Sequence, residues 1–286
     1  MSKATKNVKA IRTARAKRSA RAILIAFMVQ RQEMGSVRVI LGYLLGMTFL
    51  ALGTKDFLQY ALETGEPVNI CETFIVTASQ GMACRFWVLG YLLAVGDAPF
   101  VKGNACMVLY RSGRQVWNTG MLLYVFLQGF LYTLCLAVVS VAAGTPFGFA
   151  GGLWSSPTYM LATVASNGIA GKYHIYFDGA AIMEHMTVYQ AFGITFLYIL
   201  CYFVFLGILL YLCNLSLGGF WGLAAVSAAH LGGVVLSFAG SLHLSPAYYV
   251  DSAGSHWRYP GRMLVLILMM AAVTSAAVKR ADIQER

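Results

Sequence analysis

The sequence predicts an all-α, polytopic integral membrane protein with six transmembrane helices, an N-terminal interfacial amphipathic helix and both termini in the cytoplasm. Hydrophobic residues make up 59% of the 286 residues and charged residues only 11%, whereas roughly a quarter of a typical soluble domain is charged. A soluble chain of this composition could not cover its surface, so most apolar side chains must face lipid or other helices. Several apolar stretches also reach the roughly 20 residues that a helix needs to cross a bilayer.

The basic residues predict the orientation. Residues 1–21 contain eight Lys or Arg residues and no acid, and further cations lie in one internal loop and at the C-terminus. Lys and Arg are retained on the cytoplasmic side of short membrane loops, which places these groups inside. The formal net charge of +10 could suggest a nucleic-acid partner. Because the cations border apolar segments, topology and contact with anionic membrane lipid explain them better, and we expect no nucleic-acid partner.

Residues 1–22 are predicted to form a basic cytoplasmic extension, and residues 23–286 a single transmembrane domain. The first apolar run, residues 23–29, is too short to span, and Gln30-Arg31-Gln32-Glu33 follows it rather than a small-residue cleavage site. This run is typical of an amphipathic helix in the headgroup layer. The six spans predicted after it are residues 37–55, 73–95, 119–143, 188–215, 217–242 and 263–278.

The connections alternate between the two sides of the membrane. Residues 56–72, 144–187 and 243–262 are predicted to be external. Residues 97–118 are predicted to form a cytoplasmic loop, whose first residues, Asp97-Ala98-Pro99, end the second span. Residues 147–171 are uncharged and long enough to span, but they contain turn residues, and a seventh span would place the C-terminal cations outside. The sequence leaves open whether this segment is re-entrant or interfacial.

Small residues recur every fourth position in the predicted fifth span. A face of this kind lets another helix approach closely. Packing within the chain and contact with a second subunit explain the pattern equally well. The face consists of Ala225, Ala229, Gly233 and Ser237.

Polar residues within the spans are the candidates for a transport path: Arg85, Gln128 and His230. Charge at membrane depth is costly and faces a cavity, a partner or the interface. Arg85 could instead extend its guanidinium to the membrane boundary. Hydrogen bonds between helices would explain Gln128 and His230 without a substrate.

No catalytic constellation is recognisable, so the chain is predicted not to be an enzyme. Gly168-Ile169-Ala170-Gly171-Lys172 lacks the glycine spacing and the Ser or Thr of a phosphate-binding loop, and no H-E-x-x-H zinc motif occurs. The six cysteines include no CxxC pair, and we expect neither a metal site nor a bound cofactor.

Two stretches of the sequence have a distinctive layout. Gly96-Asp97-Ala98-Pro99-Phe100 is followed, after about ten residues, by Arg111-Ser112-Gly113-Arg114-Gln115-Val116-Trp117 and a span rich in Tyr and Leu. Near the end, Leu244-Ser245-Pro246-Ala247-Tyr248-Tyr249-Val250 precedes a last span and Lys279-Arg280-Ala281-Asp282-Ile283. In these motifs and in layout, residues 30–286 resemble the permease subunits of type-2 ATP-binding-cassette (ABC) exporters. The basic residues 1–22 and the intramembrane Arg85 depart from this resemblance.

The resemblance implies a half-transporter in a bacterial cytoplasmic membrane that pairs with itself or with a second permease. Separate cytoplasmic ATPase subunits would bind ATP and Mg and would contact a coupling helix in the 97–118 loop. The residues expected at that contact are Arg31, Glu33, Asp97, Lys102, Arg111, Arg114 and Trp117. The alternatives are an ATP-independent carrier that uses Arg85 and His230 and, from another class, a membrane enzyme or sensor.

Overall fold

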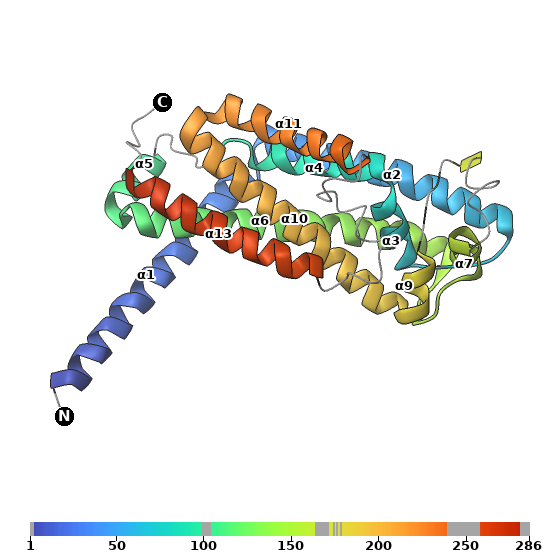
Figure 1. Cartoon of the computed structure of the whole chain (residues 1–286), viewed down its shortest axis with the longest axis horizontal. Coiled ribbons are helices and arrows are strands. Elements are labelled where there is room, and N and C mark those ends of the chain that lie inside the picture. The colour runs from blue at the N-terminus through green and yellow to red at the C-terminus, as the bar shows by residue number, and fades with distance from the viewer. Residues whose placement is uncertain are drawn as a thin grey trace.

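The structure is a computed structural model that describes residues 3–98, 104–163, 172–173, 175, 177, 179–238 and 258–280. These residues form an elongated helical bundle (Figure 1). Its elements in chain order are α1 (Lys3–Glu33), α2 (Val37–Thr64), β1 (Val68–Asn69), α3 (Glu72–Ser79), α4 (Gly81–Val95), α5 (Asn104–Ser112), α6 (Arg114–Gly144), the 3₁₀ helix η1 (Thr145–Phe147), β2 (Gly148–Phe149), α7 (Ser156–Thr163), α9 (Ala180–His185), α10 (Val188–Leu217), α11 (Gly219–Phe238) and α13 (Arg258–Arg280).

Four segments of the described chain are helical, long and apolar enough to cross a membrane: Val37–Thr64, Arg114–Phe147, Val188–Leu217 and Pro260–Lys279. They coincide with the predicted first, third, fourth and sixth spans, which confirms a mostly helical chain of the multi-pass membrane class. The predicted fifth span falls on α11, and its residues 239–242 lie outside the described part. The count of six spans and the cytoplasmic termini stay predictions.

The predicted second span is divided into two helices. α3 ends at Ser79 and α4 begins at Gly81, with Gln80 between them in an extended conformation. The Ser79 hydroxyl donates to the Val76 carbonyl, a local bond that competes with helix continuation, and Gly81 follows as a weak helix former. α4 is therefore only 15 residues long, shorter than a helix that spans alone.

Local sequence signals set the other boundaries. The Ser36 hydroxyl caps α2 by accepting from the Val39 N–H, and Thr187 and Gln190 form a capping box at the start of α10. Gly113 and Gly218 adopt positive φ angles of 82° and 89°, which favour glycine. They separate α5 from α6 and α10 from α11, so that each chain reversal needs only a single residue.

α1 crosses two predicted boundaries. It is one continuous helix from Lys3 to Glu33, so the basic extension and the apolar run 23–29 share an element. Its apolar stretch is buried on one face, where Ile25 packs against Gly120 of α6, and exposed on the other, where Leu24 and Phe27 lie. A helix that is apolar on both faces suits the boundary between headgroups and acyl chains.

The interior between α2, α4, α6 and α10 is rich in aromatic residues. The Tyr91 and Phe203 rings stack with centroids 4.8 Å apart, and the Tyr132 hydroxyl donates to the Gly42 carbonyl. α2 and α4 approach so closely that a Cβ on Gly42 would lie 2.4 Å from the Gly90 carbonyl oxygen. Small residues are what permits such an approach between helices in a membrane.

The described part of the predicted external loop 144–187 covers one end of the bundle, and we call it the cap (Figure 1). β1 and β2 pair in parallel there, and the Tyr60 hydroxyl donates to the Pro157 carbonyl. The predicted loop 56–72 is instead helical as far as Thr64. The reason is that Phe57 and Tyr60 continue the buried face of α2 and pack with apolar residues of the cap, in a cluster separate from the aromatic interior. Residues 164–171 and residues 243–257 of the predicted loop 243–262 lie outside the described part, whereas residues 258–262 of that loop are the first residues of α13.

Candidate functional site

The end of the bundle opposite this cap gathers the residues predicted to contact a cytoplasmic partner. The last turn of α1, the start of α2, the end of α4, α5, the start of α6 and the end of α13 meet there (Figure 1). The Gln115 side chain of α6 donates to the Ser275 carbonyl of α13 at 3.1 Å. The junction of α1 with α2, the stretch from α4 to α6 and the end of α13 are far apart in the sequence but form one surface.

Arg38 joins two of the predicted residues. One guanidinium nitrogen, Nη2, lies 3.1 Å from Glu33 Oε2, and the other, Nη1, lies 2.5 Å from Asp97 Oδ2. The Glu33 and Arg38 side chains are about one-fifth exposed and the Asp97 side chain is 55% exposed. The start of α2 thus connects the interfacial helix to the beginning of the 97–118 segment. Arg38 was not among the predicted residues, although a cation just inside the first span was a signal for it.

Asn214 fixes the turn that carries Asp97. Its amide nitrogen, Nδ2, donates to the carbonyls of Gly96 at 2.8 Å and Ala98 at 2.7 Å. These carbonyls follow the last turn of α4, where the backbone lacks helical donors. A buried side chain of α10 therefore holds the turn from which the predicted coupling loop departs.

α5 presents its charge outward. Arg111 and the following Arg114 are exposed, as is Arg31 at the end of α1. Trp117 is only 1% exposed and belongs to the central apolar cluster. Its place on the predicted docking surface is therefore wrong: as the fourth residue of α6 it faces the helices, and its role is packing. Lys102 lies outside the described residues.

Two of the three transport-path candidates, Arg85 and His230, interact electrostatically, whereas Gln128 bonds between two other helices. Gln128 Oε1 accepts from Gln30 Nε2 at 2.6 Å between α6 and α1. The His230 ring nitrogen Nδ1 lies 2.8 Å from the Tyr202 hydroxyl between α11 and α10. Arg85 is partly buried on α4, which contacts α11. Bonds between helices account for Gln128 and His230, and their partners Gln30 and Tyr202 were not predicted.

The small-residue face of α11 turns away from the rest of the described chain. Ala225 and Ala229 are exposed, whereas Val226 and His230 are buried. Gly233 and Ser237 lie on the same helix, but their side chains are outside the description. The exposure of the two alanines is what a contact with a second subunit would require.

A second polar cluster lies under the cap. The Glu72 carboxylate is fully buried and accepts from the backbone N–H groups of Asn69 and Ser155 and from the hydroxyls of Ser155 and Thr158. Burial raises the pKa of Glu72, and these hydrogen bonds partly oppose the rise. Glu72 ties the start of α3 to the start of α7. These bonds make the cluster a structural anchor.

Comparison with known proteins found no match: no protein-family model, no curated protein and no solved structure matches the chain.

Proposed function

We propose that this chain is the transmembrane subunit of an ABC exporter that works with separate cytoplasmic ATPase subunits. The observation that carries the proposal is the Arg38 bridge, since one residue of the first span binds both Glu33 of the interfacial helix and Asp97 of the coupling segment. In a half-transporter these are the two segments that a cytoplasmic motor would have to move together.

The short helix α5 is suited to transmit such a movement. It is followed by the single residue Gly113 and then by the 31-residue helix α6. α1 packs along the first half of α6, where a Cβ on Gly120 would lie 2.8 Å from the Ile25 side chain. A displacement of α5 would therefore also displace the start of α6, which runs the length of the bundle.

The exposed cations at this end favour an acidic docking groove on the ATPase. Arg111 and Arg114 are exposed, and guanidinium groups can bind carboxylates in two-pronged geometry. ATP and Mg would bind to the ATPase, and the permease would contribute only the docking helix and the substrate path. The substrate class that we propose is an amphipathic or lipid-like compound, a peptide or a drug, moved by this chain paired with itself or with a second permease.

The test is co-purification of the tagged chain from its native membrane in mild detergent. We expect an ATPase to accompany it and the ATPase turnover to depend on this subunit. Replacement of Arg111 and Arg114 by Gln should uncouple the turnover, while the matched change Arg18→Gln in α1 should not. Recovery of the folded chain with no ATPase under mild detergent, also after cross-linking in the membrane, would refute the proposal.

A carrier that needs no ATPase is the second candidate. His230 supports it, because the ring is buried, its Nδ1 contacts Tyr202, and its Nε2 has no partner among the described residues. A histidine of this kind can carry a proton between helices. Transport by the purified chain alone in vesicles under a proton gradient, abolished by His230→Gln, would favour the carrier over the ABC subunit.

A further inference from the structure

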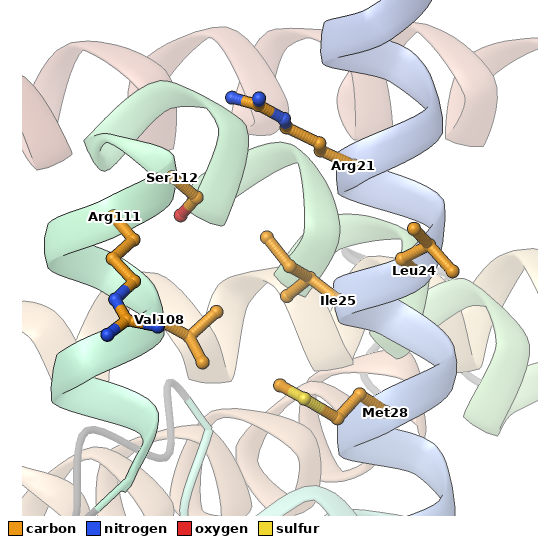
Figure 2. Close-up of a pocket in the computed structure, with 7 residues that line it drawn as sticks. All are labelled: Arg21, Leu24, Ile25, Met28, Val108, Arg111 and Ser112. Carbon is orange, nitrogen blue, oxygen red and sulfur yellow. The ribbon is translucent and has the colours of Figure 1, made fainter.

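We propose that a pocket between α1 and α5 binds the anionic headgroup of a membrane phospholipid, with an acyl chain lying along α1. The pocket has a volume of about 370 Å³. Its lining combines two arginines, a hydroxyl group and four apolar side chains (Figure 2): Arg21, Leu24, Ile25, Met28, Val108, Arg111 and Ser112.

Each wall of the pocket is one face of a helix. The α1 residues follow the spacing i, i+3, i+4 and i+7 and the α5 residues the spacing i, i+3 and i+4, which places each set on a common face. In Figure 2, Arg21, Ile25 and Met28 extend from α1 towards α5. The pocket is therefore an open groove between two helices whose lining residues lie at least 80 positions apart in the sequence.

The charge of the pocket calls for an anion. Arg21 and Arg111 both line it and neither forms an ion pair with a described residue. None of the lining residues is acidic. Guanidinium groups bind phosphate oxygens in a two-pronged geometry.

The apolar residues favour a phospholipid over a free phosphate ion. Leu24 and Met28 line the pocket and are 68% and 42% exposed, and the neighbouring Ile23 and Phe27 are also exposed. Free phosphate would neutralise the arginines but would leave this apolar surface uncovered. An acyl chain would cover it, as the apolar face of an interfacial helix is covered in a membrane.

A lipid bound in this way would join α1 to α5 at the end of the bundle where the ATPase is proposed to dock. The binding itself depends only on the chain being embedded in a membrane, and the proposed function can fail without affecting it. Lipid binding is measured on the purified chain alone, whereas the proposed function is measured with the ATPase, so the two outcomes are separable.

The experiment measures binding of phosphatidylglycerol with a fluorescent acyl chain to the purified protein in neutral detergent. Phosphatidylcholine with the same chain is the lipid control, and inorganic phosphate is tested as a competitor. We expect a preference for phosphatidylglycerol that phosphate alone does not abolish. Each of Arg21→Gln and Arg111→Gln should weaken binding about tenfold, the size of one lost charge-assisted hydrogen bond.

Arg18→Gln is the matched control, since it removes the same charge from an exposed position of α1 outside the pocket. Unchanged thermal unfolding of each variant in the same detergent shows that it is folded. Equal affinity for the two lipids, or an Arg18→Gln effect as large as those of the pocket variants, would overturn the proposal. Complete displacement by inorganic phosphate would also overturn it, because the site would then be one for a soluble anion.

Discussion

Removing the charge of Arg38 tests how firmly the interfacial helix and the coupling segment are joined. In Arg38→Gln the carboxylates of Glu33 and Asp97 both lose their cation. The two losses are unequal, because the Glu33 side chain is 20% exposed and the Asp97 side chain is 55% exposed. A partly buried carboxylate recovers little hydration when its partner is removed, whereas a half-exposed one is readily solvated.

The magnitude follows from these exposures. A hydrogen bond to a charged group contributes about 1.5–3 kcal/mol, and the Glu33–Arg38 contact at 3.1 Å is of this kind. The Asp97 contact, although shorter at 2.5 Å, behaves as a surface pair and contributes less than about 1 kcal/mol. We therefore expect Arg38→Gln to lower the free energy of unfolding by about 2–3 kcal/mol, Glu33→Gln by about 2 kcal/mol and Asp97→Asn by less than about 1 kcal/mol.

The assay is equilibrium unfolding of the purified protein in mixed micelles of neutral and denaturing detergent, followed by far-UV circular dichroism. A double-mutant cycle of Arg38→Gln with Glu33→Gln should give a coupling free energy of about 1–2 kcal/mol. Two results would refute the reasoning. One is a change in Asp97→Asn as large as in Glu33→Gln, and the other is additivity of the Arg38 and Glu33 changes.

Two further predictions concern one end and the middle of the bundle. Because burial raises the pKa of Glu72, the folded state favours its protonated form. The stability that this proton contributes is present at low pH and is lost as the pH rises through the raised pKa. Glu72→Gln should therefore reduce the dependence of the melting temperature on pH, measured from melting curves across a pH series. Gly42→Ala should lower the free energy of unfolding by about 1–3 kcal/mol, since its Cβ would lie 2.4 Å from the Gly90 carbonyl oxygen. The control Gly193→Ala should be neutral or stabilising, because a Cβ there has nothing within 4 Å. Equal effects of the two substitutions in the same assay would contradict the close contact between α2 and α4.

The helices could be located from apolar run length, because each long span is an uninterrupted apolar stretch. The break at Gln80 could not, since the residues around it are also compatible with a continuous helix. The extension of α2 to Thr64 was also missed. Charges near its end suggested a loop, but Phe57 and Tyr60 pack under the cap, and that packing depends on residues about 100 positions away.

The candidate site was predicted only in part, because contacts between residues far apart in the sequence also shape it. The charge pattern pointed to Glu33, Asp97 and the exposed arginines, because cations and acids at span boundaries are visible in the sequence. It could not show that Arg38 binds Glu33 and Asp97 together, since that depends on how three helix ends meet. Trp117 was misplaced because an aromatic residue beside cations is equally typical of an interface and of the first turn of a packed helix.

α6 connects the two polar ends of the molecule. It begins at Arg114, with only Gly113 between it and α5, and near its other end the Ser140 carbonyl accepts from the Thr73 hydroxyl at 2.9 Å. Thr73 follows Glu72, whose carboxylate holds the start of α7 in the cap. Because α6 is continuous from Arg114 to Gly144, a rigid displacement of its first turn also displaces Ser140. A movement that begins at α5 would therefore reach the cap through α6, α3 and the hydrogen bond that joins them.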